Sequence, residues 1–337
     1  MISRRKFTQG VVAAGVAGGA LSTTTAGATT GAGLRAGVHT SLGPIKRVKA
    51  GVLETAYAEL GPRHGQPVVL LHGWPYDAHS FVDVAPILAA AAGYRVIVPF
   101  LRGYGKTRFR SAKTFRNGQQ SAVALDIVAL MDALEIDQAV LGGFDWGART
   151  VGCIAALWPE RCKAIVSVSG YLITSLEKNL EPLPPAAELG WWYQYYFSTE
   201  RGVKGYTENW SAFNELIWKI VSPSWNYDAA TYARTAASFD NPDHVAIVIH
   251  NYRWRLSLAE GERRYDRYER ALATAPAIGV PAITIGSDFD GAAADGKGYR
   301  DKFTGKYEHR VFAGIGHNVP QEAPKAFAQA VIDADNL

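Results

Sequence analysis

The most informative segment of this chain is Val140-Leu141-Gly142-Gly143-Phe144-Asp145-Trp146-Gly147, and an alanine-rich segment follows it. Its pattern is G-x-Nu-x-G, a sharp turn from a buried strand into a helix, with small flanking residues that let the two approach closely. Asp145 occupies the central position, from which a nucleophile projects. A carboxylate nucleophile suits displacement at an sp³ carbon and forms an alkyl ester, whereas serine suits esters and amides. The alternative is that Asp145 only caps the following helix, since aspartate is a favourable N-cap residue.

Strand and helix patterns alternate on both sides of this turn. Val68-Val69-Leu70-Leu71 is a continuous apolar run, typical of a strand buried on both faces of a parallel sheet. Residues 48–59 alternate as strands do. Further strands are expected at 94–98, 139–143, 164–168, 282–285 and 309–312, and helices at 81–92, 123–134, after 145 and at 323–332. Strands that alternate with helices predict right-handed crossovers, and therefore an α/β fold with a mostly parallel sheet flanked by helices.

A change of composition before the strand at 282–285 indicates an inserted helical cap. Residues 171–274 lack compact valine and isoleucine runs, and their tyrosines are interleaved with six of the nine tryptophans: Trp191, Trp192, Trp210, Trp218, Trp225 and Trp254. We therefore predict a core formed by residues 48–170 and 275–337, with the cap at 171–274. Residues 29–47 are rich in threonine, glycine and alanine, which predicts a flexible linker.

The amino-terminal segment has the features of a targeting sequence. Ser3-Arg4-Arg5-Lys6-Phe7 precedes an uncharged run from Gly10 to Leu21, and Ala26-Gly27-Ala28 supplies small residues for cleavage. Residues 1–28 resemble a twin-arginine signal peptide, which predicts export to the periplasm or secretion, and no stable membrane anchoring after cleavage. The alternative is an uncleaved anchor helix, which needs about 20 strongly apolar residues. Four glycines within residues 10–19 argue against it.

Composition excludes several classes of protein. The chain has 337 residues, of which 48% are hydrophobic and 11% aromatic, and its net charge is +4, so intrinsic disorder is excluded. Three of the excess positive charges lie at Arg4, Arg5 and Lys6, which leaves no basic stripe for nucleic acid. The two cysteines, Cys153 and Cys162, are predicted to lie in the buried core rather than in a disulfide.

Neither a metal nor a cofactor is expected. No pair of cysteine or histidine residues has the spacing of a zinc site. Asp288-Phe289-Asp290-Gly291 is similar to the start of a calcium loop, but Ala292 stands where a third oxygen ligand is required.

Two backbone amides are expected to stabilise negative charge beside Asp145. His72-Gly73-Trp74-Pro75 follows the strand at 68–71, a position from which a backbone N–H reaches an oxyanion. The second N–H belongs to the residue after the nucleophile, so the expected oxyanion hole consists of the amides of Trp74 and Trp146. His72 is interpreted as a structural histidine rather than a base.

His317 and Asp288 complete the expected catalytic set. His317 follows the last strand, within Gly314-Ile315-Gly316-His317-Asn318, and Asp288 follows the strand at 282–285. The order nucleophile, acid, histidine, with each residue on a loop after a strand, is that of a catalytic triad. Asp288 would orient His317, which would activate the water that hydrolyses the ester. Asp290 is a rival for the acid, and both His317 and Asp288 have structural alternatives, as a helix cap and a turn residue.

Together these residues resemble the α/β-hydrolase superfamily, and within it the branch with an aspartate nucleophile, which contains epoxide hydrolases and the haloalkane and haloacid dehalogenases. The resemblance runs from Val48 to the carboxyl terminus and includes the cap. Residues 101–107 are similar to part of the D-x-R-G-x-G-x-S stretch of this branch, with Phe100 where its aspartate stands. The resemblance implies catalysis without a cofactor.

Epoxide hydrolases supply two cap tyrosines that hydrogen-bond the epoxide oxygen. Tyr193-Gln194-Tyr195-Tyr196-Phe197 is similar to the first tyrosine segment, with Tyr193 in the functional place, and Asn251-Tyr252-Arg253 is similar to the second, with Tyr252 in place. Tyr195 and Tyr196 compete with Tyr193, and in so aromatic a region some tyrosines only pack. The resemblance implies conversion of an epoxide into a vicinal diol through an ester on Asp145. The aromatic cap predicts an apolar or aromatic small-molecule substrate.

Two alternatives stay open. A dehalogenase would use the same Asp145 and hold the departing halide with N–H donors, one of them from Trp146, although haloalkane dehalogenases commonly carry asparagine where Trp74 stands. Fluoroacetate dehalogenases place an arginine after the nucleophile, and only their second arginine has a match here, Arg149. A ligand-binding protein of the same fold without catalytic activity is disfavoured, because binding alone does not require an intact triad.

Overall fold

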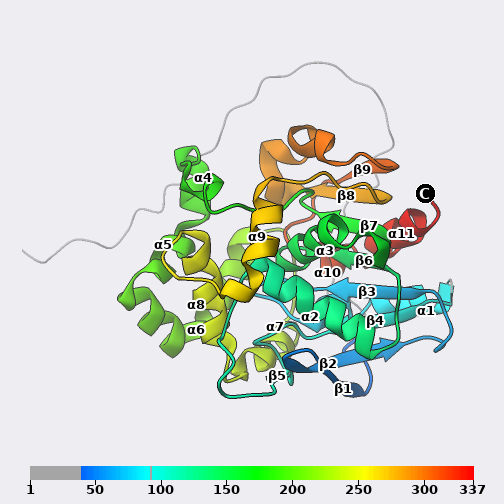
Figure 1. Ribbon diagram of the computed structural model, residues 1–337, viewed down its shortest axis with the longest axis horizontal. Helices are drawn as coiled ribbons and strands as arrows, with labels where there is room; N and C mark the ends of the chain where they lie inside the picture. Colours follow the sequence, from blue (N-terminus) through cyan, green and yellow to red (C-terminus); the bar gives the residue numbers. More distant parts are fainter. Residues whose placement is uncertain (1–38, 92) are drawn as a thin grey trace, which may run out of the picture. The chain divides into compact units, whose positions relative to one another are not determined.

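A nine-stranded sheet forms the centre of the protein in the computed structural model, which describes residues 39–91 and 93–337. Its strands follow the order β1-β2-β4-β3-β6-β7-β8-β9, and β5 pairs with β2 (Figure 1). The pairs that involve β2 are antiparallel, and all neighbours from β4 to β9 are parallel. The strands are β1 Ile45–Ala50, β2 Leu53–Leu60, β3 Pro67–Leu71, β4 Arg95–Pro99, β5 Arg108–Phe109, β6 Ala139–Gly143, β7 Cys162–Val168, β8 Ala282–Ser287 and β9 Tyr307–Phe312.

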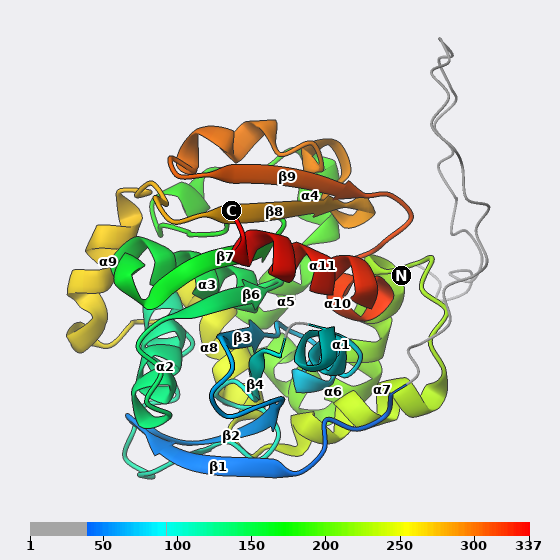
Figure 2. The ribbon, with the colours of Figure 1, turned by 90° about the vertical axis from the view of Figure 1, so that its right-hand side faces the viewer.

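Helices cover both faces of this sheet. Figure 2 shows α2 and α3 on one side and α1 and α11 on the other, with α3 packed on β3, β6 and β7 and α11 packed on β6, β7 and β8. The predicted α/β fold, a mostly parallel sheet flanked by helices, is confirmed. The helices of the core are α1 Val84–Ala91, α2 Gln120–Ala133, α3 Trp146–Leu157, α10 Val319–Glu322 and α11 Pro324–Asp335.

Burial explains why the apolar runs form the central strands. Every residue of β6 and β8 is buried, and in β3 only the first residue, Pro67, is partly exposed. Strands covered on both faces carry continuous apolar runs instead of alternating ones. The predicted helix at 81–92 differs from the structure, because the Asp77 side chain accepts a hydrogen bond from the His79 amide and starts a short 3-10 turn, Ala78–Phe81. Helix α1 then begins only at Val84.

The segment between β7 and β8, which the sequence assigns to a cap, is helical. It contains α4 Pro185–Gly190, α5 Trp192–Ser198, α6 Glu200–Val221, α7 Ala229–Ala236, α8 His244–Arg255 and α9 Asp266–Ala273. In Figure 1, α5, α6 and α8 lie beyond the end of the sheet toward which the arrowhead of β3 points. Since Asp145 follows β6 at its carboxyl end, the nucleophile faces these helices.

Several predictions concern other parts of the chain. Residues 1–28, the predicted signal peptide, and residues 29–38 of the predicted linker lie outside the described residues. Within residues 39–91 and 93–337, no helix combines the length and apolar character needed to cross a membrane. Cys153 and Cys162 are both buried, as predicted.

Candidate active site

The backbone turns sharply at Asp145, between β6 and α3. Asp145 has φ 52° and ψ −121°, a sparsely populated conformation that costs on the order of 1–3 kcal/mol and is typical of functional sites. A side chain at Gly147 would lie 1.9 Å from the carbonyl oxygen of Leu71, so only glycine lets α3 approach β3 this closely. Among the described residues, the Asp145 side chain makes no capping hydrogen bond to α3, which removes the helix-cap alternative.

The Asp145 carboxylate is held between a backbone amide and a histidine. The Trp74 amide donates a hydrogen bond of 2.8 Å to Oδ1, and Nε2 of His317 lies 3.6 Å from Oδ2. Gly73 also lies against this carboxylate, since a Cβ atom there would be 2.3 Å from Oδ1. The two carboxylate oxygens therefore have different surroundings: Oδ1 faces the amide and Oδ2 faces the histidine.

Electrostatics keep Asp145 ionised. Burial raises its pKa, but the facing His317, the charge of Arg149 and the Trp146 amide together outweigh burial, and the pKa lies below the usual aspartate value. An ionised carboxylate at neutral pH is the form required of a nucleophile. Of the two predicted oxyanion amides, that of Trp74 hydrogen-bonds this carboxylate, and that of Trp146 contributes to lowering its pKa.

The His317 loop is fixed by a second buried carboxylate. Glu322 on α10 accepts hydrogen bonds from the amides of Gly316 and Asn318, at 2.7 and 3.0 Å, and from the Ser222 hydroxyl at 2.7 Å. The same Ser222 oxygen accepts the His317 amide at 2.9 Å. The imidazole position is therefore determined by a hydrogen-bond network that ties α10 to the end of α6.

Aromatic rings pack around the His317 imidazole. The ring of Tyr76 stacks on it with centroids 5.4 Å apart, and the ring of Phe289 meets it edge-on at 4.5 Å. Nδ1 of His317 is buried, and within the described chain it has no hydrogen-bond partner. A neutral imidazole needs an acceptor at this nitrogen to fix the tautomer that leaves Nε2 free as a base.

The structure does not bring Asp288, the expected acid, to His317. The Asp288 side chain is exposed, and its Oδ2 accepts a 3.0 Å hydrogen bond from the Gly314 amide. It lines a small surface depression together with Ile315 and Gly316, outside the cavity that contains Asp145. The reason is that Ser287 ends β8 and Asp288 is the first residue of a 3-10 turn, Asp288–Ala293.

Asp290, the rival for the acid role, lies on the other side of this turn. Its side chain is half-buried and lines the same cavity as Asp145 and His317. Its Oδ2 accepts a 2.9 Å hydrogen bond from the Ser287 amide, which leaves Oδ1 available to another donor. Of the two aspartates, Asp290 is therefore the one that lines the cavity with Asp145 and His317.

The cap places two tyrosines in the cavity. Tyr193 on α5 and Tyr252 on α8 both line it, with ring centroids 5.3 Å apart in an edge-to-face arrangement. Tyr195 is 47% exposed and hydrogen-bonds Glu188, while Tyr196 stacks on Phe213. The position on α5 that faces the nucleophile is therefore occupied by Tyr193.

Both cavity tyrosines remain protonated at neutral pH. Burial, followed by the charge of Asp145, raises the pKa of Tyr193 to about 12, while Arg255 and Arg149 act in the opposite direction. Burial and the neighbouring Tyr193 raise the pKa of Tyr252 further above its ordinary value. Both phenols are thus available as hydrogen-bond donors across the physiological range.

The cavity enclosed by core and cap has a volume of about 540 Å³. Apolar and aromatic side chains form much of its wall, and charged or titratable groups are concentrated at Asp145, Arg149, Arg255, Asp290 and His317. Arg255 was not predicted from the sequence. The signal that could have found it is its spacing from Tyr252, since residues i and i+3 share a helix face.

Trp74 connects the core to the cap. Its indole Nε1 donates a 2.9 Å hydrogen bond to the hydroxyl of Tyr206 on α6, which lies 2.9 Å from Nε2 of His244 on α8. His72, two residues earlier, accepts the Leu101 amide at Nε2, and burial lowers its pKa to about 4. A neutral, hydrogen-bonded His72 fits the structural role predicted for it.

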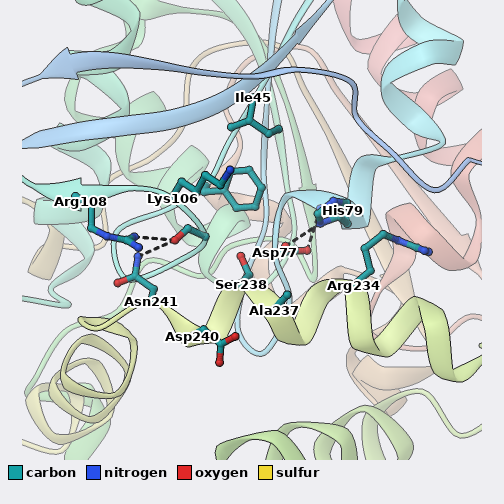
Figure 3. A pocket seen from close by; sticks show the side chains of 12 residues that line it. Ile45, Asp77, His79, Lys106, Arg108, Arg234, Ala237, Ser238, Asp240 and Asn241 are labelled. Carbon is teal, nitrogen blue, oxygen red and sulfur yellow. Dashed lines mark hydrogen bonds and ion pairs between the residues drawn. The ribbon is translucent and has the colours of Figure 1, made fainter.

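A second pocket of about 310 Å³ lies where α7 meets the loops after β3 and β4 (Figure 3). The carboxylate of Asp77 and the imidazole of His79 form a 2.9 Å ion pair on its wall, and Thr235 of the cap donates a 3.2 Å hydrogen bond to Asp77. These groups join the cap to the core. The residues that line this pocket do not include Asp145 or His317.

Comparisons with known proteins agree with this arrangement. Residues 66–205 match the alpha/beta hydrolase fold family. A candidate epoxide hydrolase from Klebsiella pneumoniae, known from its crystal structure, is 59% identical and superposes with a TM-score of 0.85, covering 87% of this chain and 97% of its own. The structure of a laboratory-evolved variant of potato epoxide hydrolase shares the fold, with a TM-score of 0.68 at 20% identity, over 86% of this chain and 98% of its own.

Sequence similarity to curated relatives covers a shorter region. Epoxide hydrolase B of Mycobacterium tuberculosis is 33% identical over 157 residues, which is 42% of this chain and 42% of that protein. The match thus spans less than half the length of this relative. Because the Klebsiella structure is 59% identical and matches 87% of this chain, the chain belongs to the α/β-hydrolase superfamily. Within that superfamily it is most similar to epoxide hydrolases, and the predicted resemblance is confirmed.

Proposed function

We propose that this protein is an epoxide hydrolase that converts a small-molecule epoxide into a vicinal diol through an alkyl ester on Asp145. The observation that carries the proposal is the placement of Asp145. Its Oδ1 accepts the Trp74 amide, its Oδ2 faces His317, and Tyr193 and Tyr252 line the same cavity. The set thus contains a nucleophile, a base and two proton donors.

In the first step, Oδ2 of Asp145 attacks a ring carbon of the epoxide and the carbon–oxygen bond of the ring breaks. The departing oxygen takes a hydrogen bond, and then a proton, from Tyr193 or Tyr252. General-acid assistance of this kind accelerates a reaction by roughly 10²- to 10⁴-fold. The product of this step is a hydroxyalkyl ester of Asp145.

In the second step, His317 takes a proton from water, which attacks the carboxyl carbon of Asp145. Negative charge develops on Oδ1, the oxygen that already accepts the Trp74 amide. Because this donor is in place before the reaction, it stabilises the oxyanion without reorganisation, an effect worth about 3 kcal/mol per donor. The tetrahedral intermediate then collapses by breaking the bond between the carboxyl carbon and Oδ2, and the diol leaves with Oδ2 and the proton that His317 returns. The remaining proton of the attacking water goes to the tyrosinate, and the Asp145 carboxylate is restored with the water oxygen in place of Oδ2.

The first test is to trap the ester. His317→Gln should permit ring opening and prevent ester hydrolysis, so the variant should gain the mass of one whole epoxide when incubated with a mixture of aryl and alkyl epoxides. Intact-protein mass spectrometry measures this gain, and peptide mapping should locate it on Asp145. The wild-type protein, which turns the ester over, is the control.

The same experiment with haloalkanes tests the dehalogenase alternative. One observation favours that alternative: the indole Nε1 of Trp146 is buried and has no hydrogen-bond partner within the described chain. It could donate to a halide. A mass gain equal to an alkyl group without its halogen would replace epoxide hydrolysis with dehalogenation, and absence of an adduct from both mixtures would contradict both.

We further propose that Asp290 orients His317 in the second step. In this proposal Oδ1 of Asp290 accepts the Nδ1 proton of His317 during ester hydrolysis, so Asp290→Asn should slow that step by roughly 10²- to 10⁴-fold. Asp288→Asn, a matched change two residues away, should leave the rate within about twofold of the wild type, as exposed groups act weakly. Single-turnover kinetics separate the two steps. Equal effects of both variants, or slowing of ester formation alone, would contradict the assignment.

A further inference from the structure

Two arginines enter the catalytic cavity from opposite structural units. Arg149 lies on α3 of the core, one helical turn after the nucleophile, and Arg255 is the last residue of α8 in the cap. Both line the cavity, and each side chain belongs to a residue that is only 8% exposed. The reaction steps derived above use neither of them.

Among the described residues, neither guanidinium has a carboxylate partner. Within residues 39–91 and 93–337, no ion pair involves Arg149 or Arg255, although buried arginines elsewhere in the protein are paired, as Arg102 is with Asp126 at 2.6 Å. Arg149 uses its Nε to donate a 3.0 Å hydrogen bond to the carbonyl of Leu172. Nε of Arg255 is buried without a partner in the described chain. Charged side chains are almost never buried this deeply unless something compensates them.

The surroundings of Arg255 keep its charge available to the cavity. Its guanidinium lies 5.5 Å from the ring of Trp191 and 5.8 Å from the ring of Tyr252, contacts that supply only modest stabilisation. Burial and the neighbouring charge of Arg149 lower its pKa to about 10. Arg255 therefore remains protonated at neutral pH, next to a second cation, where an anion would be strongly attracted.

The reaction moves negative charge within the cavity. Before catalysis the cavity contains the carboxylates of Asp145 and Asp290 together with the two arginines. When the ester forms, Asp145 loses its negative charge, and after a tyrosine has protonated the departing oxygen that charge lies on the tyrosinate. A substrate that brings its own carboxylate would keep the arginines compensated throughout the cycle.

We propose that Arg149 and Arg255 bind a carboxylate on the substrate, so that the epoxides this enzyme acts on are carboxylic acids with an apolar remainder. This inference rests on the proposed function and specifies its substrate class. A guanidinium binds a carboxylate through two parallel hydrogen bonds, which fixes orientation as well as position. Arg149 would contribute from the core and Arg255 from the cap, so the carboxylate would connect both units across the cavity. The apolar side chains of Leu172, Ile217 and Val221 would contact the hydrocarbon part.

The competing role for these arginines is stabilisation of a tyrosinate. Their charges lower the pKa of Tyr193, and a tyrosinate is formed if the phenol protonates the departing oxygen. That role is independent of the rest of the substrate, because every epoxide generates the same oxygen. The two roles therefore differ in whether the effect of an arginine depends on a substrate carboxylate.

The experiment compares epoxides that differ only in charge. Epoxides with a terminal carboxylate one, two or three carbons from the ring are paired with their neutral primary amides, and styrene oxide serves as a neutral reference. For the best-fitting length, kcat/KM for the acid should exceed that for the amide by at least about tenfold in the wild-type protein. Butanoate, but not butanamide, should inhibit hydrolysis of styrene oxide competitively.

Substitutions assign the effect to the arginines. Arg255→Gln and Arg149→Gln should each reduce the acid-to-amide ratio of kcat/KM by at least about tenfold. Arg253→Gln is the matched control, because Arg253 lies on the same helix but lines a different surface pocket, and it should preserve the ratio. If a variant fails to fold, the ratio and the butanoate inhibition measured on the wild-type protein still decide the question.

The outcomes separate this inference from the proposed function. Hydrolysis of styrene oxide with no preference for acids and no inhibition by butanoate would overturn carboxylate binding and leave the hydrolase intact. Equal loss of activity toward acids and amides in the arginine variants would assign them to the tyrosinate instead. If no epoxide is opened, the proposed function fails, and calorimetric titration of butanoate still shows whether the arginine pair binds a carboxylate.

Discussion

Replacement of Asp145 by asparagine is expected to reduce epoxide turnover by about 10⁴-fold or more, because loss of a covalent nucleophile removes the whole reaction path. Asparagine is nearly isosteric with aspartate, and it tolerates the positive φ of 52° at this position better than most residues. Alanine would add backbone strain to the chemical change. The asparagine variant therefore isolates the contribution of the carboxylate.

The measurement for Asp145→Asn is steady-state diol formation together with intact mass after incubation with epoxide. No adduct should form, in contrast to His317→Gln, and the double variant should behave as Asp145→Asn does. Asp137→Ala, at an exposed position, is the control for general effects of removing a carboxylate. Turnover within about tenfold of the wild type would show that another group is the nucleophile.

Conversion of Tyr252 to phenylalanine is expected to slow ring opening by roughly 10²-fold, and conversion of both Tyr193 and Tyr252 by up to about 10⁴-fold, because the departing oxygen then lacks a proton donor. Ester hydrolysis should change much less, since the oxygen has already been protonated by that stage. The high pKa of Tyr193, about 12, means that the donor stays protonated in alkaline solution. Any fall in activity between pH 8 and about pH 10 should therefore persist in the phenylalanine variants.

Single-turnover kinetics of ester formation and decay test the role of the tyrosines. Tyr195→Phe is the matched control, because Tyr195 lies on the same helix as Tyr193 but is 47% exposed and bonded to Glu188. It should keep both rates near those of the wild-type protein. If Tyr195→Phe slowed ring opening as much as Tyr193→Phe does, the assignment of the first cap tyrosine would be wrong.

The fold and the nucleophile could be predicted because their signals are local in sequence. The apolar run at 68–71 predicts a buried strand, and the glycines around Asp145 predict a tight turn from a strand into a helix. The structure has β3, β6 and α3 at these positions. The position of His317 after the last strand follows from the order of strands alone. These features depend only on residue type and spacing, and both can be read directly from the sequence.

Other parts of the site, the acid and Arg255, depend on three-dimensional packing that cannot be read from residue type and spacing. Asp288 and Asp290 are two residues apart, and only the geometry of the 3-10 turn after β8 sends Asp290 to the cavity and Asp288 to solvent. Arg255 was missed because its importance comes from having no ionic partner among the described residues, and partners are contributed by distant segments. Composition predicted an apolar substrate, whereas the walls of the cavity include two arginines that form no ion pair within the described part of the chain.

The hydrogen bond between the Trp74 indole and Tyr206 connects the cap to the catalytic carboxylate through one residue. The Trp74 amide donates a hydrogen bond to the nucleophile, and the Trp74 indole donates one to the cap. A single core residue therefore contacts the catalytic carboxylate and also holds the cap. Loss of the Tyr206 hydroxyl would leave the Trp74 indole without its phenol partner. In this protein, therefore, a substitution at Tyr206 of the cap acts on the residue that supplies the oxyanion amide.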